Sequence, residues 1–227
     1  VLRDISFTVK EGQTVAFIGS TGSGKSTLIQ LIPRFYDVCE GRILVNGVDV
    51  RDWDVNNLRD QIGFVAQKAN LFSGTIEENI RFGKADASMD EVIHAAKAYD
   101  FIMEKPDGFQ ERIVEGATNV SGGQKQRLSI ARALVRRPKI YIYDDSFSAL
   151  DFKTDAALRS ALKEEIDREM VLIVAQRVST IMDADQIIVL NEGKIAGCGT
   201  HKELLKSCKV YYEIAASQLS EEELQYE

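Results

Sequence analysis

The chain has 227 residues, which is enough for one sizeable domain or two small ones without disulfide or metal crosslinks. Its 28 basic and 35 acidic residues give a net charge of −7, which argues against nucleic acid or an anionic membrane surface as a docking partner. A hydrophobic content of 44% excludes a disordered or fibrous chain, and no apolar run approaches the roughly 18 residues that span a bilayer. Three cysteines without metal-ligand spacing favour a reducing, intracellular compartment. Because the chain begins at Val1, directly in a strand-like run, we expect it to be a piece of a longer protein.

Short apolar runs and helical patterns alternate along the chain. An alternating segment at residues 2–9 and a run before an Asn-Gly turn at residues 42–45 predict an N-terminal antiparallel β region. Continuously apolar runs predict buried strands at residues 15–18, 62–66, 140–143, 171–175 and 187–190. Apolar residues at helical spacing predict helices at residues 75–98, 122–136 and 156–166.

This order of elements predicts a single α/β domain. Strands that alternate with helices pack as a mostly parallel sheet with helices on its faces. We expect the core to consist of residues 1–68 and 138–216, interrupted by a mostly helical subdomain at residues 69–137. Residues 217–227 carry four acidic residues and no basic one, and we expect them to form a frayed acidic tail.

A glycine-rich segment between the strand at residues 15–18 and a helical pattern fits G-x-x-x-x-G-K-[ST]. Glycines let successive backbone N–H groups face a phosphate, Lys25 can neutralise β- and γ-phosphate oxygens, and the Ser26 hydroxyl can ligate Mg²⁺. The alternative is a surface loop beside an ordinary lysine, but the flanking strand and helix favour a nucleotide site. The predicted nucleotide-binding residues are Gly19, Ser20, Thr21, Gly22, Ser23, Gly24, Lys25, Ser26 and Thr27.

A nucleotide site of this kind also needs a carboxylate at the end of a neighbouring strand to hold the water shell of the metal. Asp144 directly follows the predicted strand at residues 140–143. An Asp after a strand is by itself more often a turn residue or a helix cap. Together with the glycine-rich loop, Asp144 becomes the best candidate for the Mg²⁺ carboxylate.

A second glycine-rich helix start, V-S-G-G-Q-K-Q-R at residues 120–127, has its own capacity to bind an anion. Read alone, it would be a flexible turn before a helix. Its order and spacing with the first loop, Gln67, Asp144 and S-A-L-D at residues 148–151 resemble the nucleotide-binding domain of ABC transporters. The segments at residues 71–80 and 199–205 are similar to exporter-type domains, and the resemblance covers essentially the whole chain.

The resemblance implies a P-loop NTPase (RecA-like) core and an ATPase that uses ATP and Mg²⁺ to drive transport. By the same resemblance, Gln67 would contact both Mg²⁺ and the transmembrane domain, so the metal site would comprise Ser26, Gln67 and Asp144. The transmembrane domain would precede Val1 in the same protein. This domain would then lie at the cytoplasmic face of the membrane.

The resemblance further implies that two such domains pair head to tail. Each ATP would lie between the P-loop of one domain and the signature motif of the other, with Asp151 at the interface. In this chain the signature residues are Ser121, Gly122, Gly123 and Gln124.

Two catalytic positions depart from the family pattern. Asp145 stands where the family has a Glu base, and Gln176 stands at the switch position, where the family has a His. Gln can donate a hydrogen bond but cannot carry a proton. We therefore expect a site that binds ATP and hydrolyses it slowly, in a dimer with a different subunit. The alternative is an active homodimer that tolerates both residues.

The two histidines of the chain do not replace the missing switch residue. His94 falls in the predicted helical subdomain, where a solvated or packed histidine is expected. His201 falls in the segment at residues 199–205, where we expect a surface position.

Two other classes of function share these motifs. The first is a soluble ABC-type mechanical ATPase acting on DNA or ribosomes. The DNA-linked proteins of this class carry a long coiled coil in the insert, but no heptads run through residues 68–120. The acidic charge balance also counts against nucleic acid. A regulatory module that senses ATP without hydrolysing it would fit Asp145 and Gln176.

Overall fold

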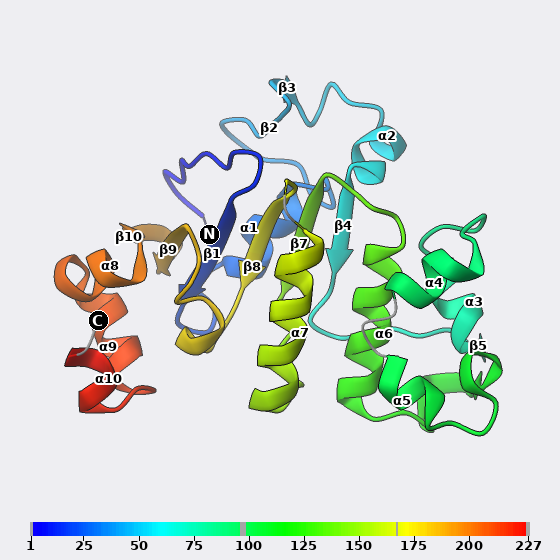
Figure 1. Cartoon of the computed structure of the whole chain (residues 1–227). Coiled ribbons are helices and arrows are strands. Elements are labelled where there is room, and N and C mark those ends of the chain that lie inside the picture. Colours follow the sequence, from blue (N-terminus) through cyan, green and yellow to red (C-terminus); the bar gives the residue numbers. More distant parts are fainter. Residues whose placement is uncertain (1, 96–98, 167, 226–227) are drawn as a thin grey trace.

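A six-stranded sheet forms the centre of the molecule (Figure 1). The computed structural model describes residues 2–95, 99–166 and 168–225. The strand order is β10-β9-β1-β8-β7-β4; β10 runs antiparallel to β9, and the other neighbours are parallel. These strands are β1 (Thr14–Gly19), β4 (Ile62–Val65), β7 (Ile140–Asp144), β8 (Met170–Val174), β9 (Gln186–Asn191) and β10 (Lys194–Gly199).

The five parallel strands are the continuously apolar runs of the sequence. Both faces of a parallel sheet are covered, so its strands need apolar side chains on both sides. In β1, Ala16 faces one buried cluster, while Val15 and Phe17 face another, and none of the three is exposed. The predicted fold class, a mostly parallel α/β sheet with helices on its faces, is confirmed, whereas the antiparallel pairing of β10 with β9 at the edge of the sheet was not predicted.

Helices cover both faces of this sheet and extend beyond its β4 edge (Figure 1). They are α1 (Lys25–Leu31), α2 (Val55–Asp60), α3 (Ile76–Arg81), α4 (Met89–Ala95), α5 (Tyr99–Met103), α6 (Gly122–Leu134), α7 (Phe152–Glu165), α8 (His201–Ser207), α9 (Lys209–Ala216) and α10 (Glu221–Gln225). Short 3₁₀ turns occur at Gly108–Gln110, Glu115–Ala117 and Val178–Thr180. Within the described residues, no helix is both long and apolar enough to cross a membrane.

The N-terminal antiparallel region is smaller than predicted. Residues 2–9 form no strand. Isolated backbone hydrogen bonds attach this segment, such as the one from Arg3 N to Gly193 O (2.8 Å), and they do not form the regular series of bonds that defines a strand pair. The predicted turn after residue 45 does form a hairpin, with positive φ at Asn46 (51°) and Gly47 (77°). The short antiparallel pairs are β2 (Leu44–Val45) with β3 (Val48–Asp49) and β5 (Gly74–Thr75) with β6 (Arg112–Ile113).

The helical stretch predicted at residues 75–98 is interrupted. A capping box between Thr75 and Glu78 begins α3, but α3 ends at Arg81 and α4 starts only at Met89. Gly83 lies in the gap, where a Cβ atom would come within 2.0 Å of a backbone oxygen of α6. Hydrophobic spacing cannot reveal this close approach between backbones. Residues 96–98, at the end of the predicted stretch, lie outside the described residues.

The C-terminal segment is more ordered than the predicted frayed tail. Residues 221–225 form α10, and Leu219 and Leu224 pack against the larger of the two apolar clusters that make up the core. These two side chains anchor the segment despite its acidic charge. Residues 226–227 lie outside the described residues.

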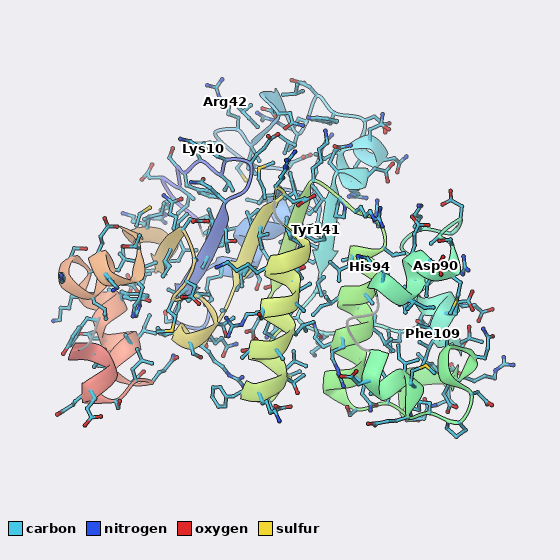
Figure 2. The ribbon with its side chains drawn as sticks, viewed as in Figure 1. Lys10, Arg42, Asp90, His94, Phe109 and Tyr141 are labelled. Carbon is cyan, nitrogen blue, oxygen red and sulfur yellow. The ribbon has the colours of Figure 1, made fainter. Side chains whose placement is uncertain are left out.

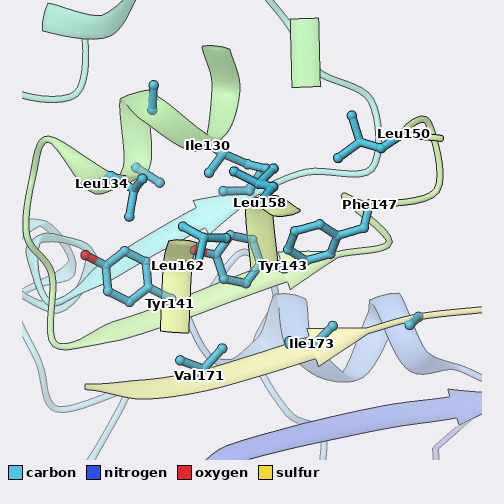
Figure 3. Packing of buried hydrophobic residues seen from close by; sticks show 14 of the residues in the cluster. Ile130, Leu134, Tyr141, Tyr143, Phe147, Leu150, Leu158, Leu162, Val171 and Ile173 are labelled. Atoms are coloured by element: carbon cyan, nitrogen blue, oxygen red, sulfur yellow. The ribbon is translucent and has the colours of Figure 1, made fainter. Parts of the chain in front are cut away.

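Figure 3 shows the part of the larger apolar cluster that lies between the sheet and helices α6 and α7. Tyr143 of β7 is completely buried there, with its ring parallel to Tyr141 and tilted against Phe147. This packing fixes the end of β7, where the chain passes into Asp144 and Asp145. The core therefore determines where both carboxylates lie.

Candidate nucleotide-binding site

The glycine-rich loop at residues 19–24 connects β1 to α1 in a conformation that needs glycine. Gly19 has a φ of 155°, and a Cβ atom there would lie 2.0 Å from the Leu190 carbonyl oxygen of β9. Gly22 and Gly24 also have positive φ values, of 81° and 98°. Gly24 is the N-cap of α1 and provides no side-chain acceptor to the first turn of the helix. This open glycine cradle is suited to the approach of a phosphate group.

Lys25 is held inside the same loop. Its ammonium group donates hydrogen bonds to the carbonyl oxygens of Gly19 (2.7 Å) and Ser20 (2.9 Å), and the side chain of Ser23 lies 3.4 Å away. Burial lowers the pKa of Lys25, while Asp145 and Asp144 counteract this shift. The loop thus contains one fixed positive charge beside its backbone N–H groups.

Ser26 and Asp144 form a hydroxyl–carboxylate pair across the sheet. Ser26 Oγ at the start of α1 donates to Asp144 Oδ1 at the end of β7, over 2.8 Å. Burial raises the pKa of the Asp144 carboxyl, and the bond from Ser26 partly offsets this shift. Hard oxygen donors of this kind are the ligands that Mg²⁺ prefers, so the pair fits the metal predicted from the sequence.

Asp145 lies beside this pair and is held by two amide side chains. Gln67 Nε2 donates to Asp145 Oδ2 over 2.9 Å, and Gln176 Nε2 donates to the same oxygen over 2.7 Å. Burial raises the pKa of the Asp145 carboxyl, while both amide bonds lower it. The two positions that depart from the family pattern are therefore in direct contact.

The structure adds two residues that the sequence reasoning did not select. Ser148 Oγ donates to the Asp145 carbonyl oxygen over 2.8 Å and closes the turn after β7. Arg177 donates to the carbonyl oxygens of Leu150 and Ser148 over 3.1 and 3.2 Å, which ties the segment after β8 to the segment after β7. In the sequence, only its position next to Gln176 could have indicated that Arg177 lies near the site.

The signature residues lie at the start of α6 and are exposed or half-buried. Ser121 and Gln124 form a capping box, with Gln124 N donating to Ser121 Oγ (3.2 Å) and Ser121 N donating to Gln124 Oε1 (3.0 Å). Gly122 is surrounded by open space, and Gly123 lies beside Leu150. Within the described residues, this motif makes no hydrogen bond to the P-loop.

Asp151 is exposed and serves as the N-cap of α7. Its carboxylate accepts bonds from the backbone N–H (2.9 Å) and the hydroxyl (2.7 Å) of Thr154. The backbone bond from Thr154 is the main reason that the pKa of Asp151 is lowered. Four predicted P-loop residues, Ser20, Thr21, Gly22 and Thr27, are also exposed.

Neither histidine lies at the site. His94 is exposed on α4, beyond the β4 edge of the sheet (Figure 2). His201 was predicted at the surface, and this prediction is wrong: it is only 3% exposed, with Nδ1 2.6 Å from the Tyr211 hydroxyl. The Tyr211 ring of α9 packs edge-on against the His201 ring.

A glycine cradle after a buried parallel strand, a held lysine and a hydroxyl–carboxylate pair define a P-loop nucleotide-binding domain. The pattern of the ABC transporter family matches residues 2–148, and the chain belongs to this family.

The relatives and solved structures agree with this assignment. The chain is 48% identical over 224 residues to the uncharacterized ABC transporter ATP-binding protein Rv1273c of Mycobacterium tuberculosis H37Rv, covering 96% of this chain and 38% of that protein. It is 47% identical over 208 residues to YgaD of Bacillus subtilis, whose name describes a multidrug export ATP-binding/permease protein, covering 90% of this chain and 36% of YgaD. A bacterial Atm1-family ABC exporter with ATP bound is 41% identical with a TM-score of 0.93, covering 97% of this chain and 39% of that chain. The chain thus spans less than two-fifths of the length of these proteins.

Proposed function

We propose that this chain is the ATP-binding motor domain of an ABC exporter. The similarity to YgaD, named for export as an ATP-binding/permease protein, and to an exporter with ATP bound supports this function. A permease part would precede residue 1 in the same protein, and residues 1–227 would lie at the cytoplasmic face of the membrane. Residues 1–68 and 138–216 would form the RecA-like core, with residues 69–137 as a helical subdomain.

The residues around the P-loop would hold ATP and Mg²⁺ in distinct ways. Backbone N–H groups of residues 19–24 would bind phosphate oxygens, and Lys25 would neutralise their charge. Ser26 and Asp144 would hold Mg²⁺, with Gln67 at the edge of its water shell. When bound, Mg²⁺ would stabilise negative charge on the β- and γ-phosphate oxygens.

We infer that this site hydrolyses ATP slowly, and the contact between Asp145 and Gln176 is the observation that carries this inference. A general base needs a carboxylate oxygen that can accept a proton from the attacking water. Here Gln67 and Gln176 both donate to Asp145 Oδ2, so the two amides restrain the carboxylate that would have to reach the attacking water. Gln176 cannot replace a protonated histidine, because an amide carries no exchangeable positive charge.

The signature motif would serve a second nucleotide-binding domain, a different subunit with Glu and His at the two departed positions. The exposed start of α6 supports this role, because Ser121 and Gln124 are preorganised by their mutual bonds. Asp151, exposed at the start of α7, would lie at the interface between the domains.

Single-turnover ATP hydrolysis with the protein in excess tests this function. We expect Mg²⁺-dependent binding of a fluorescent ATP analogue, little turnover by this chain alone, and faster turnover with a Glu- and His-containing partner domain. Lys25→Ala is the matched control and should abolish binding. Brisk turnover without a partner would show that the site is not impaired, and absence of nucleotide binding would refute the function altogether.

A regulatory ATP sensor without a transport role remains the second candidate. The two hydrogen bonds that Asp145 accepts from Gln67 and Gln176 favour this second candidate, because they restrain the residue that would activate water. Isolation of the protein from its native membrane distinguishes the two, because only a motor domain would co-purify with membrane-spanning segments.

A further inference from the structure

The end of α9 turns the chain back towards the segment after β8. Gln218 N and Leu219 N both donate to the Ala215 carbonyl oxygen, over 2.9 and 2.8 Å. Leu219 then packs into the larger apolar cluster, and Leu224 of α10 does the same. Figure 1 places α9 and α10 together near the β10 edge of the sheet. These contacts direct the Gln218 side chain towards residues 176–178.

Gln218 makes two hydrogen bonds to the main chain of that segment, which we call the switch loop (residues 176–180). Its Oε1 accepts from Val178 N over 2.8 Å, and its Nε2 donates to the Gln176 carbonyl oxygen over 2.8 Å. Arg177 between them is extended, with φ −96° and ψ 128°. An extended residue turns the preceding carbonyl and the following N–H to one side, so a single primary amide can satisfy both. The Gln218 amide thus binds the loop as a neighbouring strand would.

The same loop is also held through Arg177 and Thr180. Arg177 bonds the carbonyl oxygens of Ser148 and Leu150. Thr180 Oγ1 lies 3.3 Å from Asp155 Oδ2 on α7, and Asp155 is only 1% exposed. Neither contact involves the carbonyl group of residue 176 or the N–H group of residue 178. Those two groups depend on Gln218.

We propose that Gln218 is a positioning residue for the nucleotide site: it fixes the switch loop so that the Gln176 side chain reaches Asp145. The proposal rests on the nucleotide-binding function proposed above. Gln176 is held at its carbonyl by Gln218 and at its side-chain amide by Asp145, over 2.8 and 2.7 Å. Val178 has no exposed surface, so few water molecules can replace the Gln218 oxygen at its N–H group. Contacts of the C-terminal segment are in this way transmitted to the catalytic carboxylate.

Three variants test the proposal. Gln218→Ala removes both hydrogen bonds. Gln218→Glu keeps the side-chain length and the acceptor for Val178 N, but it places a second oxygen against the Gln176 carbonyl. Ser217→Ala is the matched control, because the Ser217 hydroxyl donates to the Ile214 carbonyl oxygen of α9 over 2.7 Å and, among the described residues, makes no bond to the switch loop.

Amide hydrogen exchange measured by mass spectrometry gives the first readout. We expect exchange in residues 176–180 to become faster by about tenfold in Gln218→Ala, the factor that corresponds to one ordinary hydrogen bond. Exchange in β1 and β7 and the unfolding temperature should stay near the wild-type values, and Ser217→Ala should change nothing. Unchanged exchange in the switch loop of both Gln218 variants would overturn the proposal. If Gln218→Ala does not fold, Gln218→Glu decides the result by the same comparison.

Steady-state ATP hydrolysis gives the second readout. A positioning role predicts that Gln218→Glu raises kcat, because a displaced Gln176 no longer holds Asp145 Oδ2. KM for ATP should stay within about twofold, because the P-loop is untouched. In a Gln176→Ala background the same substitution should have no further effect on kcat, since its route to Asp145 has been removed. An undiminished effect in that background would overturn the proposal. A wild-type chain that binds no nucleotide would refute the proposed function instead, and hydrogen exchange alone would then decide whether Gln218 holds the loop.

Discussion

Lengthening the Asp145 side chain in the variant Asp145→Glu tests whether its two amide contacts restrain catalysis. Gln176 Nε2 lies 2.7 Å and Gln67 Nε2 lies 2.9 Å from Asp145 Oδ2. One additional carbon–carbon bond moves the carboxylate by about 1.5 Å, which is more than half of either distance. The longer side chain must therefore break or rearrange at least one of these bonds. Gln176→His, made separately and in combination, replaces the Gln176 amide by a group that can carry a proton.

The expected increase in the hydrolysis rate follows from the contribution that a correctly placed general base makes to it. A general base contributes about 10²–10⁴-fold to a rate, and a misplacement of about 1 Å costs roughly 10²-fold. We expect Asp145→Glu alone to raise the single-turnover rate by about tenfold, because Gln176 still binds the carboxylate. The double variant should reach about 10²-fold, because the carboxylate is then longer and the Gln176 amide no longer holds it. The two effects should not simply multiply, since the residues are in contact.

Single-turnover ATP hydrolysis with the protein in excess measures this rate without product release. Asp145→Asn, which removes the negative charge from the same position, is the control and should not accelerate turnover. A wild-type rate equal to that of the double variant would refute the reasoning. Independent, multiplicative effects of the two substitutions would show that Gln176 does not act through Asp145.

Three further predictions concern stability. Tyr143→Phe should raise the unfolding temperature by about 2–4 °C, because the buried Tyr143 hydroxyl has no hydrogen-bond partner among the described residues; a lower unfolding temperature would contradict this. Gly19→Ala should lower the free energy of chemical unfolding by about 1–3 kcal/mol, because the added Cβ would lie 2.0 Å from the Leu190 carbonyl oxygen. A variant as stable as the wild type would show that β1 and β9 can move apart easily. Burial raises the pKa of the Asp145 carboxyl above its ordinary 3.8, so the folded protein binds a proton at this carboxyl more tightly than the unfolded chain does. The free energy of unfolding should therefore fall as the pH rises from 3.8 through the raised pKa. Asp145→Asn should flatten that part of the unfolding profile, and an unchanged slope would argue against the shift.

Much of the fold followed from local sequence patterns. The parallel strands were predicted to within a residue or two, because their apolar runs are continuous and bounded by polar turns. Residues 2–9 show the alternating pattern of a half-buried strand, yet they form no strand, because strand formation also requires a partner edge. Strand β10 was missed, since its half-exposed position at the edge of the sheet leaves few apolar residues in it. The break between α3 and α4 was missed because close backbone packing at Gly83 leaves no periodic signal.

The sequence by itself determined the P-loop, because Gly19, Lys25 and Ser26 act within one continuous turn whose spacing is visible in the chain. Only the tertiary structure decided what surrounds Asp145. Gln67 is 78 residues and Gln176 is 31 residues away from it along the chain. They meet because β4, β7 and β8 are adjacent parallel strands whose carboxyl ends share one edge of the sheet. Gln218 joins them for another reason, because the packing of Leu219 and Leu224 turns the C-terminal segment back onto the switch loop.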